Sequence, residues 1–282
     1  MEKGILTTLR YFAQFSYAPR LRELHMFHPT RVSALKHRDS VEKMTKNKQI
    51  LWTTEADGER RYTLGGYSIF LNKTLKKAAN SRYKLHGIRG YLEHIEKLQS
   101  VAMIGISGSV AVENADSAAD VDLFIVSRAG RMWTARALTG PAAAVLGIRR
   151  GRLATRASGK VCLNMFMDET DLTVPKAKQT VFVAHEILQM RPVFDRGATY
   201  YRFLKANEWV YRFFPNAKTA RTAHFTPGVK WGVSTGSFFE SLVESFAKRL
   251  QLILINRHKT TEIITDTQLW FFPDDYERKV KV

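Results

Sequence analysis

Apolar residues recur at helical spacing near the start of the chain. They form one face over residues 3–15, made of Ile5, Leu6, Leu9, Phe12 and Ala13. A short second helix is expected between Pro19 and Pro29, because proline disfavours helical geometry in the residue before it. A third helix follows over residues 30–46. Two strands around Asp57-Gly58 then give a hairpin, so residues 1–67 predict a winged-helix-like domain.

The third helix has an apolar and a polar set of positions. Its apolar positions are Val32, Leu35, Val41 and Met44, and its polar face consists of Lys36, His37, Arg38, Lys43 and Lys46. In a winged helix-turn-helix, this would be the recognition-like helix. We therefore expect its cations to be exposed if the domain binds duplex nucleic acid. Protein contacts are the alternative role.

The rest of the chain changes from helix to mixed structure and back. Residues 68–99 predict a linking helix, with Gly87 and Gly90 as interruptions. Residues 100–175 show strands at 101–106, 121–126 and 161–167 and a helix at 132–146, which predicts an α/β (α+β) fold with a small mixed sheet. Residues 176–282 are helical in character.

One C-terminal helix, at 237–255, carries a continuous apolar stripe. The stripe consists of Phe238, Leu242, Phe246, Leu250, Ile253 and Leu254. We expect it to pack against the rest of the fold. A membrane-surface or partner-binding helix would show the same pattern.

The net charge of the chain indicates which classes of molecule it can bind. The chain has 44 Lys and Arg against 26 Asp and Glu, a formal charge of +18, which favours nucleotides, nucleic acid or another polyanion over a cationic substrate. A generally basic protein without a polyanion partner is the alternative. Eight of these cations and no acidic residue lie between Arg128 and Lys160: Arg128, Arg131, Arg136, Arg149, Arg150, Arg152, Arg156 and Lys160.

The sequence shows neither an apolar run that could span a membrane nor a secretory signal. No run approaches the roughly 18 apolar residues that a membrane-spanning helix requires, and no secretory signal is evident at the start. We therefore expect a cytoplasmic protein with no membrane partner. The single cysteine, Cys162, lies in an apolar run and is expected to be a buried thiol.

The chemically informative segment joins Gly108-Ser109 to Asp120 and Asp122 through ten intervening residues. Residues two apart in a strand point to the same face, so the two aspartates are expected to share one space. Like charges so close favour a bound cation, and oxygen ligands suit Mg²⁺ with substrate phosphates. Gly108 lets a phosphate approach the main chain, and Arg128 and Arg131 follow the strand as candidate triphosphate contacts.

This segment resembles the signature of the DNA polymerase beta-like nucleotidyltransferase superfamily. The resemblance implies that Asp120 and Asp122 are catalytic and bind Mg²⁺ (or Mn²⁺), while Gly108 and Ser109 bind a nucleoside triphosphate. It also implies a third carboxylate on a neighbouring strand. In the expected strand the polar residue is Asn164, an amide that can ligate a metal but cannot act as a base. Asp168 and Glu169 are the nearby alternatives.

A wider resemblance is to a group of prokaryotic nucleotidyltransferase-like proteins with an N-terminal winged-helix-like segment. Besides the motif, it rests on Cys162-Leu163-Asn164 and on the segment from Ala184 to Pro192. Within that segment we interpret His185 and Glu186 as a helix-packing pair.

Two functions follow from the sequence. The first is transfer of a nucleoside monophosphate from a triphosphate to an acceptor hydroxyl, with nucleic acid as the favoured acceptor because the chain is basic. The second is a nucleic-acid-binding or regulatory protein whose transferase domain is catalytically weak or inactive, which the amide at Asn164 supports.

Overall fold

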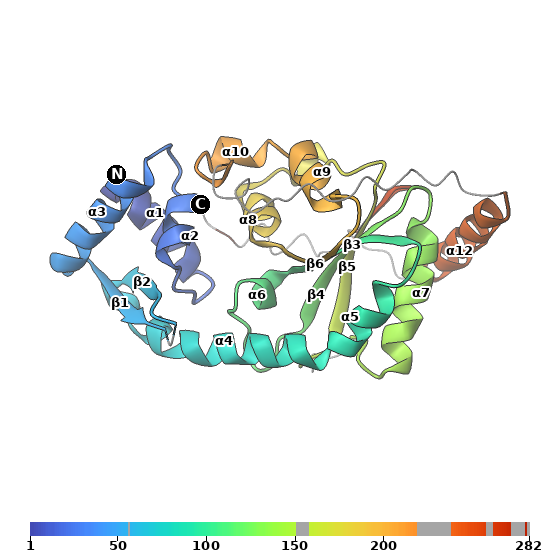
Figure 1. The fold of residues 1–282 in the computed structure, drawn as a ribbon, viewed down its shortest axis with the longest axis horizontal. Helices are drawn as coiled ribbons and strands as arrows, with labels where there is room; N and C mark the ends of the chain where they lie inside the picture. The colour runs from blue at the N-terminus through green and yellow to red at the C-terminus, as the bar shows by residue number, and fades with distance from the viewer. Residues whose placement is uncertain (56, 151–157, 219–237, 258–261, 272–279, 281–282) are drawn as a thin grey trace.

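The computed structural model describes the chain except for residues 56, 151–157, 219–237, 258–261, 272–279 and 281–282 (Figure 1). It shows a mixed α/β fold, as the sequence predicted. A six-stranded mixed sheet has helices on both faces, and a two-stranded sheet lies in the N-terminal part. Among the helices that the structure describes, none combines the length and apolar character needed to cross a membrane.

The N-terminal part has the expected order of three helices and a hairpin. The elements are α1 (Glu2–Ala13), α2 (Leu21–Met26), α3 (Ala34–Lys46), β1 (Ile50–Thr54) and β2 (Arg60–Leu64). The hairpin pairs Ile50 with Leu64 and Thr54 with Arg60. Gly58 lies in the turn with a φ of 84°, a left-handed conformation that glycine adopts without strain.

Helix α3 begins four residues later than predicted, because Ser33 caps it. The Ser33 hydroxyl accepts a hydrogen bond from the Lys36 backbone N–H. Two predictions for this helix were wrong: Leu35 is 60% exposed, and His37 is buried against the rings of His25 and His28. The four cations expected on the surface, Lys36, Arg38, Lys43 and Lys46, are exposed.

The linking segment consists of a short 3₁₀ helix, η1 (Gly65–Tyr67), and two helices, α4 (Ile69–Gly87) and α5 (Arg89–Ile95). The helical prediction is confirmed, with a break at Ile88. Helix α4 runs along one side of the molecule from the hairpin to the large sheet (Figure 1). The Lys84 ammonium donates to the carbonyls of Ser117 and Ala119, which fixes α4 beside the loop that leads to Asp120.

The large sheet is built around three central strands. Its strands are β3 (Val101–Ser107), β4 (Val121–Ser127), β5 (Val161–Asp168), β6 (Arg191–Asp195), β7 (Ile263–Ile264) and β8 (Gln268–Trp270). Their order is β6-β3-β4-β5-β8-β7. Only the β4–β5 pair is parallel among these described strands, and α7 (Met132–Val145) connects it. The sequence predicted β3, β4, β5 and α7 but missed β6, β7 and β8.

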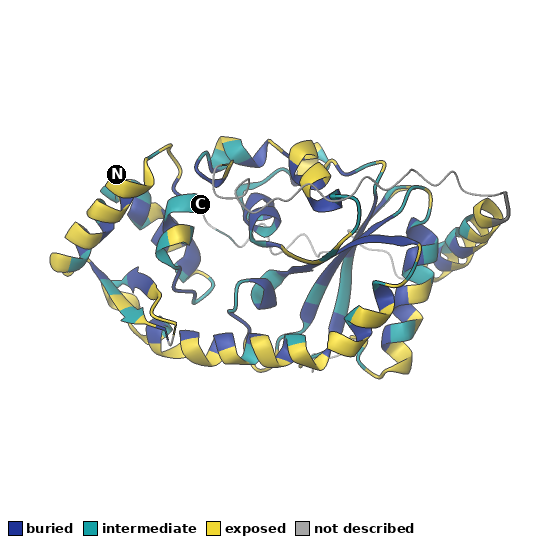
Figure 2. Cartoon of the chain, viewed as in Figure 1, coloured by how far each residue is buried: buried dark blue, intermediate teal, exposed yellow. Residues whose placement is uncertain are grey.

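Two hydrophobic cores lie on opposite faces of this sheet (Figure 2). One face packs under α8 (Val181–Gln189), α9 (Thr199–Ala206) and α10 (Val210–Phe213). The other face packs under α5, α7 and α12 (Phe238–Asn256). Alternation along β4 separates the cores, because Phe124 belongs to the first and Leu123 to the second. Short helices α6 (Gly108–Ala111) and η2 (Lys176–Lys178) complete the described elements.

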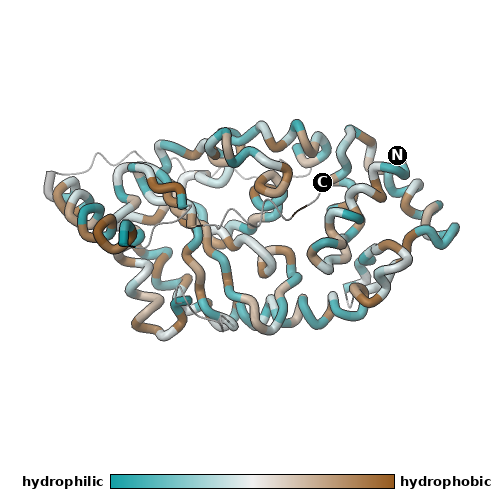
Figure 3. Tube along the Cα trace, turned by 180° about the vertical axis from the view of Figure 1, so that it is seen from behind, coloured by the Kyte–Doolittle hydropathy of each residue, from teal (hydrophilic) through white to brown (hydrophobic). Residues whose placement is uncertain are grey.

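Helix α12 packs through the side opposite to the one predicted. Glu244 and Gln251 hydrogen-bond to α7, and Ile255 is buried in the core. The expected packing stripe is instead exposed at the described positions Leu242, Phe246, Leu250, Ile253 and Leu254, and Phe246 is 70% exposed. Apolar stretches along this helix are visible at the left of Figure 3.

Candidate metal and nucleotide site

Strands β3 and β4 bring the Gly-Ser turn directly to the Asp-x-Asp segment. In their antiparallel register Ser107 lies opposite Asp122, so Gly108 follows immediately beside that aspartate. Gly108 has a φ of 64°. A Cβ at this position would lie 2.4 Å from Asp122 Oδ2. Glycine is therefore required here twice, for the backbone conformation and for the close approach of the carboxylate.

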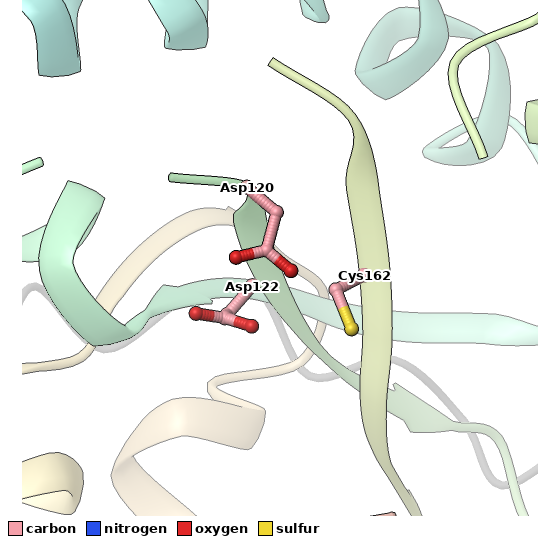
Figure 4. A group of neighbouring side chains, drawn as sticks. All are labelled: Asp120, Asp122 and Cys162. Carbon is pink, nitrogen blue, oxygen red and sulfur yellow. The ribbon is translucent and has the colours of Figure 1, made fainter. Parts of the chain in front are cut away.

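The two aspartates share one space, as the strand periodicity predicted. Asp120 lies just before β4 and Asp122 is its second residue. Their carboxylates lie beside each other at the start of β4, next to Cys162 of β5 (Figure 4). Ligand atoms of these three residues all lie within 4.8 Å of one another. Ser109 is half-buried in α6, next to Gly108.

A β-bulge in β5 adds Asn164 to the same group. Leu123 pairs with Leu163, but Phe124 pairs with Met165, so Asn164 is an extra residue in the parallel ladder. The Asn164 amide donates to Asp122 Oδ1, and the Cys162 thiol donates to Asn164 Oδ1 at 2.6 Å. The bulge thus directs the amide toward Asp122, while Met165 enters the core on the same side of the sheet.

The electrostatics of this group favour a bound cation. Burial, together with the charges of Asp120 and Glu186, raises the pKa of Asp122 to about 8. Burial and the same two aspartates raise the pKa of Cys162 to about 12, so the sulfur is a neutral thiol at pH 7. The oxygen ligands available are therefore the two carboxylates and, once the amide turns over, the Asn164 oxygen that here accepts from Cys162. Such a set fits Mg²⁺ or Mn²⁺ better than a thiolate-binding metal.

Glu186 is the residue that the sequence interpretation missed. It lies on α8, and its Oε2 accepts a hydrogen bond from the Gly108 backbone N–H at 3.2 Å. Burial raises its pKa. An acidic residue in an otherwise apolar helix was the available signal, but local spacing could not relate α8 to the Gly108 turn. Its neighbour His185 does pack structurally, stacked on Tyr11 with ring centroids 3.8 Å apart.

Arg150 brings a positive charge to the site. The sequence placed it in the basic stretch but did not indicate that it lies beside Asp120. Its Nη1 lies 2.5 Å from Asp120 Oδ2 and 3.9 Å from Cys162 Sγ. The Arg150 side chain is 40% exposed, so it borders the site rather than lying inside the core. Arg152 and Arg156 of the same basic stretch lie outside the described residues.

The structure does not bring Arg128 and Arg131 to the aspartates. Both residues follow the opposite end of β4, and six residues of extended chain place Arg128 roughly 20 Å from Asp122. Arg131 also forms an ion pair with Glu240 of α12. The expectation that these two arginines line the same triphosphate site is therefore corrected, because strand geometry separates the two ends.

Asp168 and Glu169 do not supply the third carboxylate either. Asp168 ends β5 at the same far end, where its carboxylate accepts hydrogen bonds from the backbone N–H groups of Gly130 and Thr170. Glu169 forms an ion pair with Arg202 at 2.5 Å. Alternation does not place Asp168 on the face of Asn164, because the bulge shifts the phase of β5 between them.

Searches of protein-family models, curated proteins and solved structures each found no match for the chain. The residues around Gly108 and Asp122 are therefore the basis for assigning a function.

Proposed function

We propose that the chain is a nucleotidyltransferase of the DNA polymerase beta-like type, transferring a nucleoside monophosphate from a nucleoside triphosphate to an acceptor hydroxyl. The observation that carries the proposal is the meeting of the Gly-Ser turn with Asp120 and Asp122. A Cβ at Gly108 would stand 2.4 Å from Asp122 Oδ2, so the turn and the carboxylates form one site although ten residues separate the two motifs. A cytoplasmic location belongs to this proposal.

Each residue of the site would have its own role in the reaction. Asp120, Asp122 and the Asn164 amide oxygen would hold Mg²⁺ or Mn²⁺, which would offset the negative charge of the phosphates. Ser109 offers its hydroxyl to a phosphate and Gly108 keeps the turn free of a bulky side chain, while the Gly108 N–H would exchange Glu186 for a phosphate oxygen. Arg150 offers a guanidinium beside Asp120 for a phosphate oxygen. Positioning and charge stabilisation are the main requirements of phosphoryl transfer.

The proposed bond changes are those of an in-line displacement. The acceptor oxygen forms a bond to the α-phosphorus while the bond from that phosphorus to the pyrophosphate oxygen breaks. Pyrophosphate leaves with the electron pair, and the proton of the hydroxyl passes to a neighbouring carboxylate. Glu186 is the carboxylate at the Gly108 turn, and burial raises its pKa. A carboxylate with a raised pKa holds a transferred proton more readily than an exposed one.

A second candidate is a nucleic-acid-binding or regulatory protein with weak or absent transfer. Two observations support it. Strand β5 presents the amide of Asn164 where the superfamily resemblance implies a carboxylate, and α3 presents exposed cations in an N-terminal part that we interpret as a winged helix. Under this candidate the site binds nucleotide but transfers no label.

The decisive experiment uses nucleoside triphosphates labelled at the α-phosphate, with Mg²⁺ or Mn²⁺ and pooled cellular RNA, DNA and protein. We expect label on one pool, and we expect Asp120→Asn with Asp122→Asn to abolish both transfer and metal-dependent nucleotide binding. The matched control, Asp116→Asn with Asp266→Asn, makes the same charge change at exposed positions and should keep both.

The outcomes separate the two candidates. Metal-dependent nucleotide binding without transfer to any pool would favour the regulatory protein. Unchanged nucleotide binding by the doubly substituted site variant would contradict both. Circular dichroism of each variant establishes that it is folded.

A further inference from the structure

A hollow of about 280 Å³ lies where α4 and α5 meet strand β6. It is lined by Arg82, Leu85, His86, Arg89, Leu92 and Val193. Leu85 and Leu92 pack against the core and form an apolar floor. The arginine side chains are 66% and 73% exposed and form a cationic rim.

This combination suits one unit of a nucleic-acid strand. An apolar floor accepts a flat nucleobase, and guanidinium groups bind the phosphates that flank it. Arg82 lies 3.6 Å from Glu113 and Arg89 lies 2.8 Å from Glu93. Ion pairs this exposed contribute little, so both guanidinium groups can exchange their carboxylate partners for phosphates.

The hollow lies close to the proposed catalytic site along β3. Its wall residue Val193 is flanked by Pro192, which pairs with Gly105, and by Phe194, which pairs with Ile104. Gly108 is three residues beyond Gly105, about 10 Å along the strand. The exposed Arg191 pairs with Ile106 and lies between the two places. The hollow lies on the face of the second core and Asp122 on the face of the first, so a strand seated in the hollow reaches Gly108 by passing the β6 edge of the sheet.

A different side of α4, turned away from the hollow, also carries cations and an aromatic ring. Lys73 and Lys76 are exposed there, and Tyr83 is 80% exposed. An exposed aromatic ring among cations is a feature of surfaces that stack the bases of single strands. The face follows α4 along the side of the molecule toward the β1–β2 hairpin (Figure 1).

We propose that this hollow binds a nucleobase of a single-stranded nucleic acid, with Arg82 and Arg89 on the adjoining phosphates. The inference rests on the proposed function and deepens it, because it names single-stranded nucleic acid as the acceptor, held in a hollow outside the carboxylate site. An acidic peptide added to the edge of β6 is disfavoured. Pro192 removes one backbone donor from β6, which weakens the pairing of an added peptide strand at that edge.

The test measures binding of a labelled single-stranded oligonucleotide, about twelve nucleotides long, to the full chain by fluorescence anisotropy over a range of salt concentrations. RNA and DNA are tested separately. Arg82→Gln with Arg89→Gln should weaken binding at least about tenfold. The slope of log affinity against log salt should fall by roughly 1.4, because two phosphate contacts are lost.

Two further variants make the test specific to the hollow. Lys176→Gln with Lys205→Gln removes the same charge from exposed positions on η2 and α9 and should leave affinity within about twofold of wild type, since neither residue lines the hollow. Val193→Gln fills the hollow without removing a cation. It should lower affinity several-fold with an unchanged salt slope.

Three results would overturn the proposal: wild-type affinity after loss of Arg82 and Arg89, an equal loss in the Lys176, Lys205 control, or equal competition by polyglutamate of matched charge. Metal-dependent triphosphate binding is measured on the same proteins. Its persistence in the Arg82, Arg89 variant, with oligonucleotide binding lost, would support the hollow. If nucleotide binding instead survives loss of Asp120 and Asp122, the proposed function fails while the oligonucleotide data still decide whether the hollow binds a strand.

Discussion

An aspartate lies at each end of strand β4, and the groups around the two carboxylates differ. At the far end, Asp168 of β5 is 2% exposed and is surrounded by donors. It accepts from the backbone N–H groups of Gly130 and Thr170 and from the Thr170 hydroxyl. At the near end, Asp122 faces Asp120 and the charge of Glu186, which raise its pKa. Donors mark a structural carboxylate, whereas other carboxylates mark a place for a cation.

The comparison also explains why the two arginines first associated with the site belong elsewhere. The turn after β4 is held by Asp168, and the cation after it, Arg131, pairs with Glu240 of α12. At the near end a different arginine, Arg150, pairs with Asp120. Each end therefore has its own arginine, and only the near end leaves its carboxylates crowded.

The largest expected loss of folding stability is at the far end of β4, where Asp168 lies. Asp168→Ala leaves several buried donors without an acceptor and should lower the free energy of unfolding by about 3 kcal/mol. Asp122→Ala should cost far less, because it relieves repulsion. Urea unfolding of both variants measures the difference. Equal losses would show that the two carboxylates serve the fold alike.

A smaller effect is expected at Gly108. Gly108→Ala should cost about 2 kcal/mol, partly from its positive φ and partly from the approach to Asp122 Oδ2. Gly130→Ala is the matched control, because Gly130 has a φ of 65° but no atom within 4 Å of an added Cβ. It should cost only the conformational part, about 1 kcal/mol. In an Asp122→Ala background the cost of Gly108→Ala should fall to the same value, as a double-mutant cycle would measure.

The smallest effect is a pH dependence specific to the near end. Because the pKa of Asp122 is raised from 3.8 to about 8, its protonated form is favoured in the folded protein. The stability it contributes is complete below pH 3.8 and is lost as pH rises toward 8, with a slope of at most about 1.4 kcal/mol per pH unit. Wild type should therefore lose at most about 1.4 kcal/mol of stability relative to Asp122→Asn when unfolding is measured from pH 5 to 6.

The opposite trend, or none, would contradict crowding at Asp122. Saturating Mn²⁺ should flatten the wild-type slope, since a cation favours the ionised form. The same comparison made with Asp168→Asn serves as the control from the structural end.

Much of the near end was predictable because strand periodicity is local. Alternation places Asp120 and Asp122 together, and the Gly-Ser pair preceding them was recognised from its spacing. Glu186 and Arg150 were not assigned, because their positions depend on how α8 and the chain after α7 pack against the sheet. The α12 stripe was assigned to the wrong side for a related reason. Helical spacing identifies an apolar face, but Glu244 and Gln251 hold the opposite face on α7.

The bulge at Asn164 divides β5 into two halves with different phase. Before it, Cys162 lies on the side of Asp122 and Leu163 on the other; after it, Met165 and Met167 fill the first core and Phe166 the second. Because of this one extra residue, odd-numbered side chains point to one face of the sheet before the bulge and to the other face after it. A deletion at position 164 would restore regular alternation, with Cys162, Met165 and Met167 on the side of Asp122 and Leu163 and Phe166 on the other, and it would remove the amide from the site. The length of β5, as much as its composition, therefore fixes which of its residues face the site.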